Sequence, residues 1–253
     1  MHLILTGATG MIGTGVLDRM LQAKDVTRVS ILSRRPVRFA DEVKDPRVSV
    51  IIHPDFANYN SPTLQDQLKD AKGCVWALGS TSTTQVTAEE YVKVTKDYSV
   101  EAAKAFAKMG TAEEPFRFVY ISGEGATQTP GMMTSLYARV KGEAEEALAK
   151  VADDNPSLMV LSARPAGVDG TGHAAVEKYG PDAIFFHKVV RTTLLPTLRM
   201  FYGKMHTPTV MLGDVCTQLA MGRLDHKLEG YGAIRLGTRA WILRNWGVQR
   251  LAE

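Results

Sequence analysis

The sequence is poor in cysteine and has no long uninterrupted apolar segment. Only two of its 253 residues are cysteines, Cys74 and Cys216, and neither lies in a C-x-x-C or metal-ligand pattern. This excludes a disulfide framework and favours two buried thiols. No apolar span reaches the roughly 18 residues of a membrane helix, and the first residues show no basic leader or small-residue cleavage site. We therefore expect no signal peptide, no transmembrane helix and a cytoplasmic location.

A strong charge of one sign is also lacking. The chain has 30 basic and 27 acidic residues, a net charge of +3, and these charges are dispersed. Such a balance argues against a nucleic-acid partner and is compatible with a bound anionic cofactor. Hydrophobic residues make up 45% and charged residues 23%, as in globular proteins. Without a linker, residues 1–253 are expected to form a single domain.

What the sequence does contain, almost at once, is a glycine-rich turn in "LILTGATGMIG" (residues 3–13). An apolar strand ends at Thr6 and is followed by Gly7, Gly10 and Gly13, spaced G-x-x-G-x-x-G. This spacing is typical of a sharp turn that lets the backbone approach a pyrophosphate at a helix N-terminus. We expect the helix to begin near Met11, and the ligand to contact a set of turn residues: Gly7, Thr9, Gly10, Met11 and Ile12. An ordinary strand-to-helix turn is the alternative that the glycines alone leave open.

Strands and helices alternate along the rest of the chain. Near-continuous apolar runs predict further strands at 28–36, 47–52, 73–79, 116–123 and 158–168. Helical spacing predicts helices after the glycine turn, at about 88–109 and at 136–151. This alternation predicts an α/β fold with a doubly wound parallel sheet, in which ligands bind beyond the carboxyl ends of the strands.

The end of the second strand indicates which dinucleotide fits. A site for NAD usually places Asp or Glu about 20 residues after the glycines, to bind the ribose hydroxyl. This chain has Ser33 there, followed by Arg34 and Arg35. Guanidinium groups without a carboxylate favour a 2′-phosphate, so we predict NADP(H). The alternative is a solvated pair of arginines in a turn before Pro36.

A serine, a tyrosine and a lysine supply groups suited to hydride transfer. Tyr137 and Lys141 lie four residues apart in a helical stretch, and Ser122 ends the strand before that helix. Tyr137 would donate a proton to the oxygen of a carbonyl as hydride arrives, while Ser122 donates a hydrogen bond to that oxygen. An ordinary phenol has a pKa of about 10, and the charges of Lys141 and of an oxidised nicotinamide would lower it.

The segments "TGATGMIG", "YISGEGA", "YARVKGEAE" and "SARPAGV", in this order, resemble the short-chain dehydrogenase/reductase superfamily and, within it, the atypical Tat-interacting-protein-like branch. The resemblance implies a Rossmann-type sheet with a small C-terminal substrate-binding portion, and Ser122, Tyr137 and Lys141 as catalytic residues. It also implies that Lys141 contacts the cofactor, together with residues at two further strand ends: Ala77, Leu78, Pro165, Ala166, Gly167 and Val168. Many relatives have an asparagine on the helix after the fourth strand; here Thr95 or a water molecule would replace it.

Residues 171–207 are expected to form a substrate-side insertion, as the resemblance implies. Its apolar residues, Phe185, Phe186, Leu194 and Leu195, are alternatively the core of a helix. Basic residues alternate with them, as on a helix at a membrane surface: Lys188, Arg191, Arg199 and Lys204. Pro196 interrupts such a helix, so membrane contact is not expected. His187 and His206 contact substrate or are structural, and without a carboxylate or thiol at ligand spacing we expect no metal.

Residues 206–222 resemble the returning strand and helix that close the substrate side in the same superfamily, with Asp214 as a helix N-cap. Together these features predict an NADPH-dependent reductase of a small or medium-sized carbonyl or related unsaturated compound, acting as a monomer or homodimer. Two alternatives remain open. One is an NADPH-sensing interaction protein, and the other is an epimerase or other non-reductive enzyme on the same fold.

Overall fold

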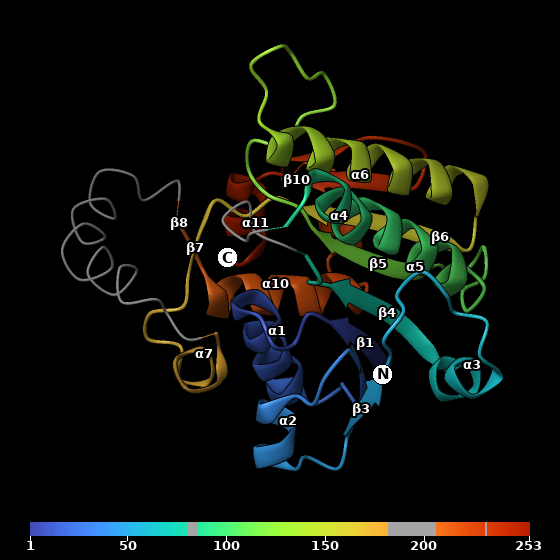
Figure 1. Cartoon of the computed structure of the whole chain (residues 1–253), viewed down its shortest axis with the longest axis vertical. Helices are drawn as coiled ribbons and strands as arrows, with labels where there is room; N and C mark the ends of the chain where they lie inside the picture. Colours follow the sequence, from blue (N-terminus) through green and yellow to red (C-terminus); the bar gives the residue numbers. More distant parts are fainter. Residues whose placement is uncertain (80–85, 182–205, 231) are drawn as a thin grey trace.

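The computed structural model describes residues 1–79, 86–181, 206–230 and 232–253. Its centre is an eight-stranded sheet with the order β3-β2-β1-β4-β5-β6-β10-β9 (Figure 1). The strands are parallel except β9, which pairs antiparallel with β10. Their bounds are β1 His2–Thr6, β2 Arg28–Ser33, β3 Val48–Ile52, β4 Ala71–Trp76, β5 Phe116–Ile121, β6 Leu158–Ala163, β9 Ala233–Arg235 and β10 Ala240–Leu243. The doubly wound parallel sheet that the sequence predicts is confirmed.

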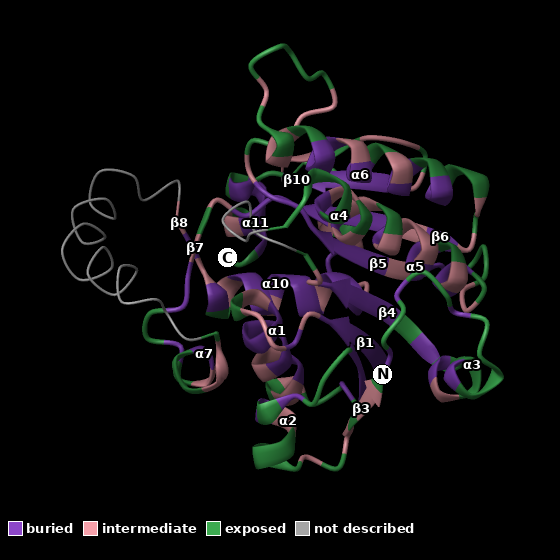
Figure 2. Cartoon of the chain, in the orientation of Figure 1, coloured by how far each residue is buried: buried purple, intermediate pink, exposed green. Residues whose placement is uncertain are grey.

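Helices cover both faces of this sheet, because the strands send alternate side chains into two cores. Leu3 and Leu5 of β1 pack with the helices of one face, and Ile4 packs with those of the other. The first layer contains α1 (Met11–Gln22), α10 (Thr209–Ala220) and α11 (Asn245–Leu251). The second contains α3 (Pro62–Leu68), α5 (Tyr98–Ala107) and α6 (Leu136–Asp154). Figure 2 shows the central strands β1, β4 and β5 largely buried between these layers.

Several short elements join these layers, including a short 3₁₀ helix at Asp225–Lys227. They also include α2 (Arg38–Val43), α4 (Ala88–Val92), α7 (Ala174–Tyr179) and the parallel two-stranded sheet of β7 (Gly167–Asp169) and β8 (His206–Pro208). Both cysteines are buried thiols, as predicted. In the described ranges no helix combines the length and apolar character needed to cross a bilayer.

The strand order reverses between β1 and β4. From β1 the chain proceeds outward through β2 to β3, and it then returns to the other side of β1 as β4. Connections on the two sides therefore diverge at the carboxyl ends of β1 and β4, which leaves space there for a ligand. The glycine turn lies at this point, since it directly follows β1.

Several predicted elements differ in detail. The helix expected at 88–109 is divided by a π-helical turn at Lys93–Asp97. The strand expected at 158–168 ends at Ala163, and residues 167–169 join β8 in the smaller sheet, because Pro165 has no N–H to continue the ladder. The predicted N-cap role of Asp214 is wrong, because α10 begins at Thr209 and Asp214 lies inside it.

Most of the substrate-side insertion lies outside the described residues. This applies to residues 182–205, which include the following predicted positions: Phe185, Phe186, His187, Lys188, Arg191, Leu194, Leu195, Pro196, Arg199 and Lys204.

Candidate functional site

The glycine turn after β1 depends on two of its glycines for backbone reasons. Gly7 has a φ of +70°, and a Cβ on it would lie 2.3 Å from the Ala77 carbonyl oxygen. A Cβ on Gly13 would lie 2.1 Å from the Gly7 carbonyl oxygen. Either side chain would collide with backbone, so both glycines are required by the fold itself.

Gly10 is different because the space above it is open. A Cβ there would meet only the Gly7 carbonyl oxygen, at 3.4 Å. Helix α1 begins at Met11, as predicted, and Gly10 provides no side-chain cap for its first N–H groups. Thr9 and Ile12 flank this turn half-buried, and Met11 is exposed. The turn therefore offers open space and uncapped N–H groups to an anion, and it fits the pyrophosphate of a dinucleotide.

Ser33, Arg34 and Arg35 follow β2 at the same edge of the sheet. The Ser33 hydroxyl donates a hydrogen bond to the Arg35 carbonyl oxygen at 2.7 Å and accepts one from the Arg35 N–H at 3.3 Å. This closes a tight turn and holds the two arginines outside the core. Both side chains are exposed, and neither guanidinium group makes a hydrogen bond or ion pair with any residue that the structure describes. Their guanidinium groups are free to bind a phosphate.

The end of β4 connects the glycine turn with α6. Ala77 abuts Gly7, and the Leu78 N–H donates to the Thr6 hydroxyl at 3.2 Å. A Cβ on the next residue, Gly79, would lie 3.8 Å from Lys141 Nζ. The structure therefore brings together the predicted residues Ala77, Leu78 and Lys141: the first two lie beside the glycine turn, and the residue that follows them lies beside Lys141.

Ser122 and Tyr137 are adjacent in space. Ser122 follows β5, is 5% exposed, and its hydroxyl has no hydrogen-bond partner among the described residues. The Tyr137 hydroxyl lies against Gly123, where a Cβ would be only 1.6 Å from it. Burial raises the pKa of Tyr137 above its ordinary value, and the charge of Arg164 opposes this rise. The phenol is therefore protonated at neutral pH and able to donate.

Lys141 is buried, 6% exposed, one helical turn after Tyr137 on α6. Its ammonium donates to the Ile121 carbonyl oxygen at 2.7 Å and lies 4.8 Å from the centroid of the Tyr120 ring. Burial lowers the pKa of Lys141 to about 8, and Glu145 opposes this shift. Burial raises the pKa of Tyr137 here and the Lys141 ammonium donates to Ile121, so the lowering of the Tyr137 pKa by Lys141 and an oxidised nicotinamide stays a prediction.

The loop after β6 lies beside Ser122. The Pro165 carbonyl accepts a hydrogen bond from the Glu124 N–H at 2.8 Å. The Ala166 N–H donates to the Thr207 hydroxyl at 3.0 Å and to the Asn245 side-chain oxygen at 3.2 Å. Gly167 and Val168 continue into β7. The predicted loop thus borders the Ser122 end of the site, held there by the C-terminal part of the chain.

Thr95, the expected replacement for an asparagine, lies in the π-helical turn and is completely buried. Its carbonyl accepts a hydrogen bond from the Tyr120 hydroxyl at 3.0 Å. Thr95 is therefore linked to Lys141 through the Tyr120 ring and makes no hydrogen bond to it.

Three further residues near the site were missed from the sequence: Gln128, Glu145 and Arg164. Glu145 and Arg164 form a buried ion pair, and Gln128 binds both. Two sequence signals were available. Glu145 stands four residues after Lys141 on one helix face, and Arg164 is a lone charge at the end of an apolar strand.

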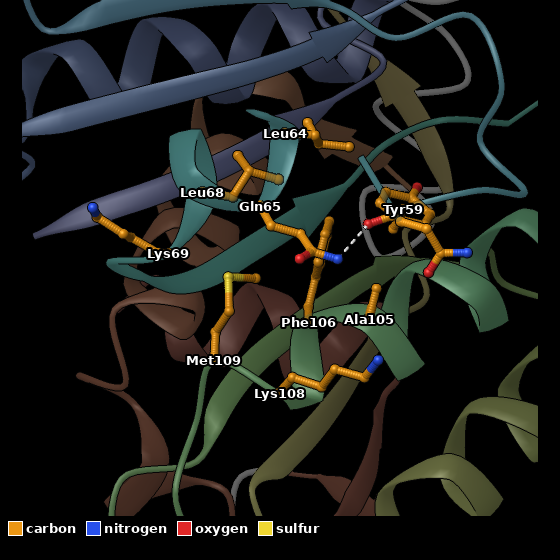
Figure 3. Close-up of a pocket in the computed structure, with 10 residues that line it drawn as sticks. Tyr59, Leu64, Gln65, Leu68, Lys69, Ala105, Phe106, Lys108 and Met109 are labelled. Atoms are coloured by element: carbon orange, nitrogen blue, oxygen red, sulfur yellow. Dashed lines mark hydrogen bonds between the residues drawn. The ribbon is translucent and has the colours of Figure 1, made fainter. Parts of the chain in front are cut away.

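A groove of about 400 Å³ lies elsewhere, between α3 and α5 (Figure 3). Leu64, Leu68, Phe106 and Met109 contribute apolar lining, and the Gln65 amide donates to the Tyr59 carbonyl at 3.0 Å. None of the predicted site residues lines it, and in the described ranges no three His, Cys, Asp or Glu residues are placed to hold a metal ion.

Comparison with known proteins gives curated fungal relatives. The chain is 38% identical over 154 residues to Botcinic acid biosynthesis cluster B protein 16 of Botryotinia fuckeliana, covering 60% of this chain and 97% of that protein. It is 33% identical over 217 residues to Leucinostatins biosynthesis cluster protein T of Purpureocillium lilacinum, covering 79% of this chain and 77% of that protein.

A third relative corrects the expected location. The chain is 30% identical over 145 residues to "Protein fmp52, mitochondrial" of Emericella nidulans, covering 57% of this chain and 59% of that protein. Further Fmp52 proteins with the same designation also match. The expectation of a cytoplasmic location, which rested on missing targeting signals, is contradicted by these names.

Solved structures share the fold. MoeE5, in complex with UDP-glucose and NAD, superposes with a TM-score of 0.66 at 16% identity, covering 96% of this chain and 75% of that one. Residues 3–192 match the NAD dependent epimerase/dehydratase family. Members of this family are nicotinamide-dependent, oxidoreductase-type proteins of the short-chain dehydrogenase/reductase superfamily, in agreement with the resemblance drawn from the motifs. This chain belongs to the NAD dependent epimerase/dehydratase family.

Proposed function

We propose that the protein is an NADPH-dependent reductase of a small or medium-sized carbonyl or related unsaturated compound. The observation that carries this proposal is the pair of hydroxyl groups at the carboxyl edge of the sheet. The buried Ser122 hydroxyl has no partner among the described residues, and the Tyr137 hydroxyl lies against Gly123, the residue that follows Ser122. A substrate oxygen placed between them would receive two hydrogen bonds.

Each of these side chains then has a defined task. The nicotinamide supplies hydride when it is bound. Tyr137 gives its proton to the substrate oxygen, and its phenol carries that proton at neutral pH. Ser122 donates a hydrogen bond to the same oxygen as negative charge develops there. Lys141, within reach of Gly79 on the path from the glycine turn, holds the cofactor ribose and adds a positive charge.

The arginines support NADPH as the cofactor. Arg34 and Arg35 extend from the end of β2, and no carboxylate stands at Ser33, where a site for NAD usually has one. A 2′-phosphate would pair with their guanidinium groups, since both lack a partner among the described residues.

Removal of the phenol oxygen tests the assignment. We expect Tyr137→Phe to lower NADPH-dependent reduction by about 100-fold or more while NADPH affinity stays within a few-fold. Ser122→Ala should lower turnover less. Reduction of a panel of aldehydes and ketones, followed through NADPH absorbance, measures the turnover of both variants. Tyr59→Phe is the matched control, because Tyr59 lines the α3–α5 groove and its buried hydroxyl has no partner among the described residues. A substrate reduced at full rate by Tyr137→Phe would contradict the proposal.

An epimerase is the second candidate, and the family match favours it. An epimerase returns the hydride that it removes and consumes no cofactor, whereas a reductase oxidises one NADPH for each product. Product analysis with a stoichiometric amount of NADPH separates the two. Conversion without loss of NADPH would replace the reductase proposal with the epimerase.

A further inference from the structure

Three side chains from separate segments form a closed polar network beside the catalytic helix. Arg164 Nε donates to Glu145 Oε1 at 2.8 Å, and Arg164 Nη2 is bound to Glu145 Oε2. Gln128 Nε2 donates to the same Glu145 Oε2, while Gln128 Oε1 accepts from Arg164 Nη2 at 3.2 Å. The Glu145 side chain is fully buried and that of Arg164 is 9% exposed. The Gln128 amide thus bridges both members of a buried ion pair.

The segment that carries Gln128 is docked on α6 beside Tyr137 and Lys141. The Thr127 N–H donates to the Ala138 carbonyl oxygen at 3.1 Å. The Thr127 carbonyl approaches the helix at Gly142, where a Cβ would lie only 1.8 Å from its oxygen. Residues 127 and 128 therefore cross the helix along Ala138, Gly142 and Glu145, and the first two of these positions directly follow Tyr137 and Lys141.

We propose that Gln128 is a positioning residue, which clamps the 126–128 segment to α6 through Glu145 and Arg164 and thereby fixes Tyr137 against Gly123 and Ser122. This rests on the proposed role of Tyr137. The β5–α6 connection carries Ser122 at its start and leads into the helix that bears Tyr137. A contact that holds the middle of this connection to the helix therefore sets the distance between the two hydroxyl groups.

An amide suits this position for a chemical reason. Glu145 needs a further donor and Arg164 a further acceptor, and a buried charge left without its hydrogen bonds is costly. An amide supplies a donor and an acceptor at once without a charge. An apolar side chain supplies neither, and a carboxylate would add a second negative charge beside Glu145.

Gln128 also offers a way to separate position from charge. Burial raises the pKa of Tyr137 most; the phenol of Tyr91 and the carboxylates of Glu145 and Glu124 raise it further, and Arg164 lowers it. Replacing Glu145 or Arg164 would change that balance and leave a buried charge unpaired. Replacing the neutral Gln128 leaves both charges in place, so its effect on Tyr137 is one of position.

The experiment uses Gln128→Met, which keeps the length of the side chain and removes the amide. Protein labelled with ¹³C at tyrosine Cζ gives one resonance for each of the eight tyrosines, and Tyr137→Phe assigns that of Tyr137. We expect the Tyr137 resonance to shift or broaden, and the Thr127 amide to exchange at least tenfold faster. Gln65→Met is the matched control, because it removes an amide hydrogen bond in the α3–α5 groove.

Gln128→Ala gives a second test with a smaller side chain at this half-buried position, in case the methionine prevents folding. If the Tyr137 resonance and Thr127 exchange match those of unmodified protein, the proposal is overturned, even if the stability to urea falls. Neither readout needs substrate. Failure to reduce any carbonyl would therefore count against the proposed function. An unchanged Tyr137 resonance would count against the positioning role of Gln128.

Discussion

Arg34 and Arg35 are exposed side chains whose loss should change cofactor choice and little else. We expect the unmodified protein to bind NADPH at least tenfold more tightly than NADH, about 1.4 kcal/mol. Arg34→Ala with Arg35→Ala should remove most of this difference, because the arginines have no described partner in the fold. Titration calorimetry measures both affinities. Arg139→Ala, an exposed arginine on α6, should leave them unchanged, and equal affinities in the unmodified protein would reject the assignment to NADPH.

Lys141 should make cofactor binding depend on pH in the alkaline range. Burial lowers the pKa of Lys141 to about 8, so its ammonium is charged at pH 7 and neutral well above pH 8. A bound anion stabilises the charged form, so NADPH affinity should be highest at neutral pH and fall with a midpoint at or above this value. Fluorescence titration between pH 7 and pH 10 would detect the fall.

The control for this pH dependence is a second lysine. Lys141→Met should bind NADPH weakly at every pH, with a flat profile. Lys108→Met removes an exposed lysine at the end of α5 and should keep the fall of the unmodified protein. A flat profile in the unmodified protein would contradict contact between the Lys141 ammonium and the cofactor.

At the scale of the element, the turn between β1 and α1 assigns separate tasks to its glycines. Gly10→Val should weaken NADPH binding by at least tenfold and leave the fold intact, because the added side chain enters open space where the pyrophosphate must approach. Gly13→Ala should instead lower the free energy of unfolding by about 1–3 kcal/mol, because its Cβ collides with Gly7 backbone. Urea unfolding and NADPH titration distinguish the two. A stable Gly10→Val protein with normal NADPH affinity would show that the cofactor phosphates do not bind at this turn.

At the scale of the whole molecule, the first and last parts of the chain are packed together through α1 and α10. A Cβ on Gly213 would lie 2.7 Å from the Gly15 carbonyl oxygen, so the two helix backbones touch at glycine. We expect Gly213→Val to lower the free energy of unfolding by about 1–3 kcal/mol, measured by urea denaturation. Gly131→Val is the matched control, since nothing lies within 4 Å of a Cβ there. Equal stabilities of the two variants would contradict this packing.

Much of the fold could be predicted because its signals are local. The glycine spacing, the apolar runs and the order of Ser122, Tyr137 and Lys141 each depend on a few neighbouring residues, and they indicated the parallel sheet and the edge that carries the site. The C-terminal strand β10 was missed. Its four residues are a short apolar run, and only pairing with β6, some 80 residues earlier, makes them a buried strand.

The sequence by itself determined the sheet, the turn that fits a dinucleotide and the set of side chains at the carboxyl edge. The tertiary structure decided how those side chains are bound: Lys141 to the Ile121 carbonyl, and Glu145 to both Arg164 and Gln128. Helical periodicity assigns a residue to a face of its helix, but the partner on that face comes from another segment. Burial, which sets the pKa of Tyr137 and Lys141, likewise exists only after those segments have packed.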